Sequence, residues 1–323
     1  MHSQFRPTGR DPHYEGGYEI DQGVLPRGTS GAIVRFRATG GDDGRSNPKA
    51  NAAALSPMTE DMMFSLSAVA ALVPSSLVAL RRDSGPDAVY WMVLAVAVAG
   101  PLAWVVAQMS GAWRTGLSTT LWVTVAASMA LFAVIVAVHR QAWRLTPLMA
   151  PYMLGIGILA TIWQHAPQKP LGAAAPAGWI EVHIVVSVAT YGLVTIAAVA
   201  ALAAFLQERS LKAKRPTALT RLLPSVADCE SLMVRLLVLG AIVLALGLAT
   251  GMATQYEETG AVLEFDHKTI LTVTAFAVIG GLLVAHFRSG VRGRMAARFV
   301  LLAYLLLTLG YPGVKFVTDV LMA

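Results

Sequence analysis

Residues 179–214 read WIEVHIVVSVATYGLVTIAAVAALAAFLQERSLKAK, and this stretch decides the fold. About 25 consecutive residues in it are almost all apolar, which is enough for a helix to cross a bilayer with some tilt. The stretch ends in a cluster of Lys and Arg, so we predict that this end lies in the cytoplasm. Helical spacing puts the polar residues on one stripe, which must face protein or a cavity rather than lipid. The stripe consists of His183, Ser187, Thr190, Tyr191 and Thr195.

The composition of the whole chain is that of a membrane protein. Of its 323 residues, 55% are hydrophobic and only 14% are charged, and the mean hydropathy is +0.59. The net charge of +6 does not indicate nucleic-acid binding, because the basic residues lie in short segments between apolar runs. Cys229 is the single cysteine, which excludes an intramolecular disulfide, a CxxC redox pair and a cysteine-based metal site.

The chain divides into a polar N-terminal segment and a membrane domain. Residues 1–57 are rich in Gly, Arg, Asp, Ser and Pro and are predicted to be disordered. They are either a flexible tail or the result of a start codon placed too early. Residues 58–323 are predicted to form an all-α, polytopic integral membrane domain. Eight apolar runs predict its transmembrane helices, at residues 62–80, 88–109, 119–138, 147–164, 179–206, 232–253, 269–287 and 297–317.

The positive charges in the connections predict the orientation. One set of connections holds 13 Lys and Arg residues, whereas the other set and the C-terminus hold four, namely Arg114, Lys169, Lys268 and Lys315. The larger set is predicted to be cytoplasmic, which places both ends of the folded part outside the cytoplasm. Its members are Arg81, Arg82, Arg140, Arg144, Arg209, Lys212, Lys214, Arg215, Arg221, Arg288, Arg292, Arg294 and Arg298.

Two histidines are candidate ligands. His183 and His267 lie at the predicted outer ends of the fifth and seventh spans. Two imidazoles from facing helices can ligate one metal or haem iron, so a shared site is one interpretation. Independent hydrogen-bonded or pore-lining histidines are the other. His139 and His286 lie at predicted cytoplasmic ends beside arginines, where a positive group at a helix end is ordinary.

The last span carries a second polar stripe. Tyr304, Thr308, Tyr311 and Lys315 recur at helical spacing, and Lys315 lies at the predicted outer surface. The charge of Lys315 could pair with an acidic cofactor group such as a propionate. Alternatively, the Lys315 side chain could extend to the membrane interface or pair with Asp319. The chain has no GxxxxGK[ST], HExxH or GxSxG motif, so the usual hydrolytic enzymes are not supported.

Four stretches carry a resemblance to a known family. They are residues 182–212 (VHIVVSVATYGLVTIAAVAALAAFLQERSLK), 223–240 (LPSVADCESLMVRLLVLG), 266–278 (DHKTILTVTAFAV) and 309–317 (LGYPGVKFV). In this order they resemble the cytochrome c assembly family of membrane proteins, especially its YpjD-like inner-membrane branch, with HemX-like proteins and the CcsA-type haem-handling subunits as relatives. The resemblance is specific from residue 179 onward and rests mainly on hydropathy before it.

The resemblance implies a multi-pass protein of the bacterial inner membrane that binds or handles haem during cytochrome c biogenesis. It places His183 and His267 at the level where relatives hold haem, with Tyr191, Tyr311 and Lys315 as further cofactor-binding candidates. The tryptophan-rich WGxxWxWD-type stretch of the synthases is absent, since Trp163 and Trp179 are isolated. The resemblance therefore implies a haem-binding or haem-delivering protein rather than an enzyme.

Two other functions compete with this interpretation. One is a HemX-like membrane regulator that acts on a haem-biosynthesis enzyme through the basic loops. The other is a small-solute transporter, whose flux would not depend on haem. The expected partners are the lipid bilayer and either cytochrome c maturation subunits or a haem-biosynthesis enzyme, but not nucleic acid.

The charge distribution leads to a topology prediction. An alkaline phosphatase reporter fused within residues 210–231 is expected to be inactive, because the positive charges hold this connection in the cytoplasm. The same reporter fused after residue 169 should be active. An active fusion within residues 210–231 would contradict the predicted topology.

Overall fold

The computed structural model describes residues 48–79, 85–109, 114–166, 169–170, 177–260 and 266–321. Long helices dominate this part of the chain, and the two-residue strands β1 (Arg114–Thr115) and β2 (Lys169–Pro170) pair in antiparallel fashion. In chain order, the helical elements are α1 (Pro48–Val78), α2 (Ala88–Met109), α3 (Leu117–Val138), η1 (Ala142–Leu145), α4 (Thr146–Ile162), α5 (Ala177–Ala213), α6 (Ala218–Leu222), α7 (Val226–Thr259), α8 (His267–Ser289), α9 (Gly293–Thr308), η2 (Leu309–Gly313), α10 (Val314–Phe316) and η3 (Val317–Leu321).

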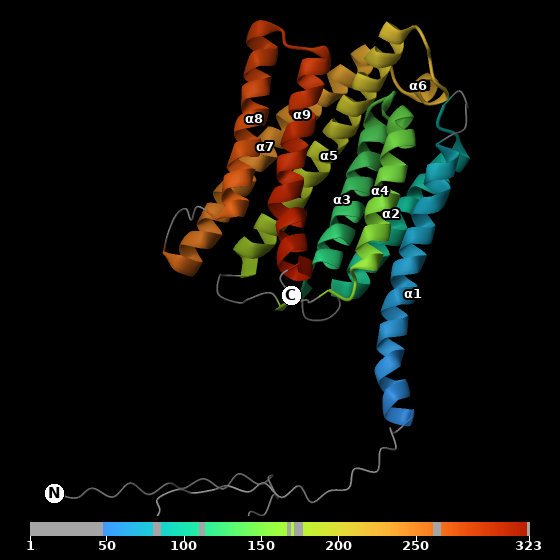
Figure 1. Cartoon of the computed structure of the whole chain (residues 1–323), viewed down its shortest axis with the longest axis vertical. Helices are drawn as coiled ribbons and strands as arrows, with labels where there is room; N and C mark the ends of the chain where they lie inside the picture. The colour runs from blue at the N-terminus through green and yellow to red at the C-terminus, as the bar shows by residue number, and fades with distance from the viewer. Residues whose placement is uncertain are drawn as a thin grey trace, which may run out of the picture. The chain divides into compact units, whose positions relative to one another are not determined.

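The prediction of eight membrane spans is confirmed. Within the described ranges, eight helical segments are long and apolar enough to cross a membrane (Figure 1). Six of them correspond to α1–α3, α5, α7 and α8, one combines η1 with α4, and the last combines α9, η2 and α10. The fold class predicted from hydropathy is therefore correct.

The connections between α3 and α4, between α5 and α7, and between α8 and α9 gather at one end of the helices, which we call the basic end (Figure 1). A contact confirms part of this arrangement, because Arg144 donates to the carbonyl oxygens of Leu222 at 3.1 Å and Arg221 at 3.2 Å. The helices α5 and α8 begin, and α10 ends, at the opposite end, which we call the histidine end. That the basic end faces the cytoplasm stays a prediction.

Helix α1 begins at Pro48, ten residues before the predicted start of the membrane domain. Its first turns contain Ala50 and three consecutive alanines at 52–54. Alanine has the highest helix propensity, and proline is favoured at the first helical position, so this segment extends the helix although its composition is polar. The rest of the predicted disordered tail, residues 1–47, lies outside the described residues.

Helix α5 is the central helix of the domain. It packs against α3, α4, α7 and α9, and 67% of its spanning window is buried, compared with 17–50% for the other seven spans. With 37 residues it is about 55 Å long at 1.5 Å per residue. Its most buried part contains six small residues, which let neighbouring helices approach closely. These are Ala197, Ala198, Ala200, Ala201, Ala203 and Ala204.

Glycines bring α7 against α5. A Cβ atom on Gly240 would lie 3.4 Å from Val194, and one on Gly247 would lie 3.5 Å from Val186. Gly251 completes the series one turn after Gly247, and it faces His183. The spacing Gly247-x-x-x-Gly251 is the small-residue pattern by which membrane helices pack closely.

A wide turn follows α9. Residues Leu309–Gly313 (η2) form a π-helical turn around Pro312, which has no backbone N–H to donate to the preceding turn. A Cβ atom on Gly310 would lie 3.2 Å from the Cβ atom of Leu271, so the turn packs directly against α8. A π turn holds one more residue than an α turn and therefore rotates the residues that follow it.

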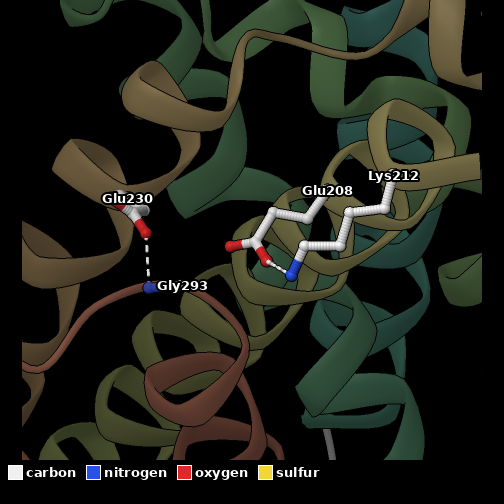
Figure 2. A network of polar contacts seen from close by, with 4 residues as sticks. All are labelled: Glu208, Lys212, Glu230 and Gly293. Atoms are coloured by element: carbon white, nitrogen blue, oxygen red, sulfur yellow. Dashed lines mark hydrogen bonds and ion pairs between the residues drawn. The ribbon is translucent and has the colours of Figure 1, made fainter. Parts of the chain in front are cut away.

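Two carboxylates stand at the start of α9, at the basic end. Glu230 of α7 accepts a hydrogen bond from the backbone N–H of Gly293 at 2.6 Å, and Glu208 of α5 forms an ion pair with Lys212 at 3.7 Å (Figure 2). The first N–H groups of a helix have no partner within the helix, and a carboxylate also stabilises the positive end of its dipole. Glu230 thus joins α7 to α9.

The connection between α5 and α7 is tied to α5. The Gln207 side chain donates to the carbonyl oxygens of Thr220, Leu223 and Pro224 at 2.8–3.2 Å. Ser225 then caps α7, because its hydroxyl accepts from the backbone N–H of Asp228 at 3.2 Å. This cap starts α7 at Val226, six residues before the start predicted from hydropathy alone.

The contacts in Figure 2 lead to a stability prediction. Glu230→Ala is expected to reduce the free energy of unfolding by roughly 1–2 kcal/mol, because it removes a charge-assisted hydrogen bond from a helix start. Glu230→Gln keeps an acceptor and should lose less. Thermal melting in detergent measures both effects.

Glu208→Ala is the matched control, since Lys212 is 65% exposed and such a pair contributes little. Equal losses from Glu208→Ala and Glu230→Ala would contradict a specific role for the Gly293 contact.

Candidate functional site

His183 lies on α5 near the histidine end, with its imidazole against α7. Its Nδ1 atom is 3.1 Å from the hydroxyl oxygen of Thr250, and its Nε2 atom is 3.5 Å from the hydroxyl oxygen of Ser187. The imidazole is half-buried, whereas Ser187 is exposed. Within the polar stripe of α5, His183 therefore faces protein, whereas Ser187 remains accessible.

The hydrogen bonds of Thr250 favour one tautomer of His183. The Thr250 hydroxyl donates its one hydrogen to the carbonyl oxygens of Leu246 at 2.9 Å and Gly247 at 3.1 Å. We assign the imidazole proton to Nδ1, with the Thr250 oxygen as its acceptor, because two backbone carbonyl oxygens take the Thr250 hydrogen. Nε2 then carries the lone pair, with the Ser187 hydroxyl beside it. A metal-binding histidine is commonly held in this way, by a hydrogen bond from its other ring nitrogen.

Gly251 leaves the space that the His183 ring occupies. A Cβ atom at position 251 would lie 3.0 Å from Cε1 and 3.5 Å from Nδ1 of the imidazole. An alanine here would force the ring to shift by a few tenths of an ångström. Thr250 and Gly251 together determine where the imidazole lies.

Three tyrosine hydroxyls meet farther along α5, between α4, α5 and α9. The Tyr191 hydroxyl is 3.2 Å from that of Tyr304 and 3.0 Å from that of Thr308. The Tyr304 hydroxyl also contacts that of Tyr152. We call these four residues the hydroxyl cluster. It joins the stripe of α5 to the stripe of α9. Helical spacing predicted each stripe but not their contact.

His267 is the first residue of α8, and its side chain is exposed. The preceding residue, Asp266, caps the helix by accepting from the backbone N–H of Thr269 at 2.7 Å. Slight burial acts to raise the pKa of the Asp266 carboxyl, but the Thr269 hydrogen bonds and the neighbouring charges of Lys268 and His267 outweigh it, so this pKa lies below its ordinary value. The carboxylate thus keeps its charge beside His267.

Tyr311 and Lys315 lie in and after the wide turn. Tyr311 is 48% exposed and is not part of the hydroxyl cluster, because the π turn changes the helical register that placed it on the stripe with Tyr304 and Thr308. Lys315 is half-buried in α10. The ring of the adjacent Phe316 packs edge-on against Trp163 at 5.3 Å, which brings the end of α4 to the same place.

The two candidate histidines lie on helices that share neighbours. Helix α5 packs against α7 and α9, and α8 packs against the same two helices. His183 contacts α7, whereas the first turn of α8 packs at Gly310 in the wide turn. No group of three His, Cys, Asp or Glu side chains suited to a metal ion occurs among the described residues. A single ligand bridging both histidines remains a prediction.

Sequence reasoning missed the residues that position His183. Thr250 and Gly251 lie in the part of α7 between Arg235 and Glu257, which has no charged residue to draw attention. The spacing Gly247-x-x-x-Gly251 was the available signal, because it marks the face of α7 that approaches another helix. Tyr152, the α4 member of the hydroxyl cluster, had no such signal.

Comparisons with known proteins agree with this architecture. The sequence profile of the family described as "Cytochrome C assembly protein" matches residues 88–322. The chain therefore belongs to the cytochrome c assembly protein family, and this membership supports a role in cytochrome c biogenesis. The recognition made from four stretches of sequence is thus confirmed. No solved structure matches the chain.

Three relatives illustrate the range of similarity. An Azospirillum brasilense protein named "Uncharacterized 28.8 kDa protein in nifR3-like 5'region" is 56% identical over 270 residues, covering 82% of this chain and 100% of the relative. The inner membrane protein YpjD of Escherichia coli K12 is 28% identical over 187 residues, covering 58% and 69%. Protein HemX of Brevibacillus brevis is 25% identical over 166 residues, covering 50% and 61%.

The hydroxyl cluster can be tested by removing one hydroxyl. Tyr304→Phe is expected to lower the free energy of unfolding by roughly 0.6–1.7 kcal/mol, the range of hydrogen bonds between membrane helices. Tyr311→Phe, on the same segment but outside the cluster, is the matched control and should change little. Unfolding in mixed detergent measures both. Equal values for the two variants would show that the cluster contributes no stability.

Proposed function

We propose that this chain binds haem at the histidine end and holds or delivers it during cytochrome c assembly, without itself catalysing the attachment. Membership of the family supports the process, and the geometry of His183 supports the ligand. The observation that carries the proposal is the contact of His183 Nδ1 with the Thr250 hydroxyl at 3.1 Å. With the imidazole proton assigned to Nδ1, Nε2 is unprotonated. An unprotonated imidazole nitrogen is the group that haem iron takes as an axial ligand.

The other residues at this end fit the rest of the cofactor. His267 is an exposed imidazole at the start of α8 and would supply the second ligand. Lys315 and Lys268 place positive charge at the same end, where propionates would be expected. Haem, when bound, would supply an iron centre and a large apolar surface. Tyr191 lies farther along α5 than His183. There the hydroxyl cluster would hold α5 and α9 in a fixed register.

The residues of the chain orient and retain the ligand. Thr250 holds the His183 ring in one tautomer, and Gly251 allows it to lie against α7. Side-chain atoms held by such secondary contacts need less reorganisation on binding. The name of the YpjD relative supports the further proposal that the bilayer in question is a bacterial inner membrane.

Ligation is tested by the absorption spectrum of the purified protein. The wild-type chain should show a Soret band, and His183→Ala or His267→Ala should weaken haem retention while leaving the fold intact, since neither side chain is fully buried. His139→Ala and His286→Ala are controls and should change little. Lys315→Ala should cause a smaller loss than either ligand variant, as expected for a charge pair rather than a metal bond. An unchanged haem content in the double variant of His183 and His267 would refute the site.

A sharper test moves His183 without changing it. Gly251→Ala places a Cβ atom 3.0 Å from the ring, whereas Gly247→Ala places one at an ordinary 3.5 Å from Val186. We expect haem affinity to fall about tenfold or more in Gly251→Ala, as for other residues that orient a ligand. Gly247→Ala, one turn away on the same face, should retain wild-type affinity. Haem titration followed by absorbance compares them.

A regulatory function is the second candidate, because the chain also matches Protein HemX. In that case the basic end would bind a haem-biosynthesis enzyme. A purified protein that lacks Soret absorbance but forms a stable complex with such an enzyme would favour regulation over haem binding.

A further inference from the structure

A surface hollow of 520 Å³ follows the first half of α9, away from the candidate haem site. It is lined by Arg294, Met295, Arg298, Phe299 and Leu302, all of which are exposed. The two arginines are four residues apart, and the apolar residues recur at steps of four and three, so they lie on one face of the helix. The opposite face, with Ala296, Ala297, Val300 and Ala303, is buried.

The order of these residues along α9 matches the polarity of a bilayer leaflet. Helix α9 starts at Gly293 at the basic end, so Arg294 lies in its first turn. Arg298 is about 6 Å deeper at 1.5 Å per residue. Phe299 and Leu302 extend the hollow further toward the membrane interior. The surface therefore changes from positively charged to apolar over a short distance along α9. A phospholipid changes in the same order, from its phosphate to its acyl chains.

The two arginines remain available for an external anion. Arg294 lies over the ring of Phe205 at 5.6 Å, a contact that keeps its charge and orients its guanidinium. The two carboxylates described at the start of α9 are engaged elsewhere, Glu230 with the Gly293 N–H and Glu208 with Lys212 (Figure 2). No ion pair involves Arg294 or Arg298 among the residues that the structure describes.

We propose that this hollow binds one acidic phospholipid, with its phosphate between Arg294 and Arg298 and an acyl chain along Met295, Phe299 and Leu302. Guanidinium groups are well suited to phosphate, because their planar donors match its oxygens. Basic pockets at the cytoplasmic end of membrane helices commonly hold anionic headgroups. The bound lipid would cover the exposed apolar face of α9.

Native mass spectrometry with phosphatidylglycerol and phosphatidylcholine tests the proposal. The wild-type chain should retain phosphatidylglycerol in preference to phosphatidylcholine and melt at higher temperature when it is added. Each arginine near the headgroups should contribute about fivefold to the affinity, so Arg294→Gln with Arg298→Gln should weaken phosphatidylglycerol binding roughly 25-fold. Binding of phosphatidylcholine should stay the same.

The matched control is Arg209→Gln with Arg215→Gln, which removes two exposed charges from the same end of the protein. This variant should keep most of the phosphatidylglycerol binding. An equal loss in both double variants would refute a specific site in favour of general charge attraction. A mass corresponding to two chains that disappears only in the Arg294/Arg298 variant would instead show that a second copy occupies the hollow. If the double variant does not fold, Arg298→Gln alone should show the fivefold loss, and wild-type lipid binding by it would overturn the proposal.

Discussion

Close approach of α5 and α7 is the constraint on which the rest of the structure depends. Lipid chains are as apolar as leucine, so helices in a membrane associate through van der Waals packing rather than through the hydrophobic effect. Glycines 240, 247 and 251 remove side chains from the contact surface of α7, and the buried alanines of α5 keep the side chains of that helix small. The same closeness that holds the helices together brings Thr250 within hydrogen-bonding distance of His183.

The packing of the helices also determines how polar groups in the interior find hydrogen-bond partners. An unsatisfied hydroxyl is unfavourable in an apolar medium, and the stripe of α5 meets this requirement in two ways. Thr190 and Thr195 donate to backbone carbonyls one turn earlier. Tyr191 finds its partners on α9. Hydroxyls that bond within their own helix leave the surface free for packing, whereas Tyr191 specifies which helix must lie beside it.

Hydropathy and charge predicted most of the fold, because a membrane span has to be long and apolar. The polar stripes of α5 and α9 were likewise readable from helical spacing. The start of α1 at Pro48 was not, since alanine propensity extended the helix into a polar segment. Tyr311 was placed on a stripe that the π turn interrupts. Partners contributed by another helix, such as Thr250 for His183, depend on how helices face each other, and local sequence does not encode this directly.

The wide turn at Leu309–Gly313 holds one residue more than a regular α-helical turn. If the extra residue moved one position along the chain, one side chain would swing by roughly 100°, the rotation per residue of an α-helix, without any helix unwinding. Tyr311 lies inside this turn and Lys315 just beyond it. A shift of this kind would change the direction in which a side chain of the turn such as Tyr311 faces, while the contact of Gly310 with α8 could remain.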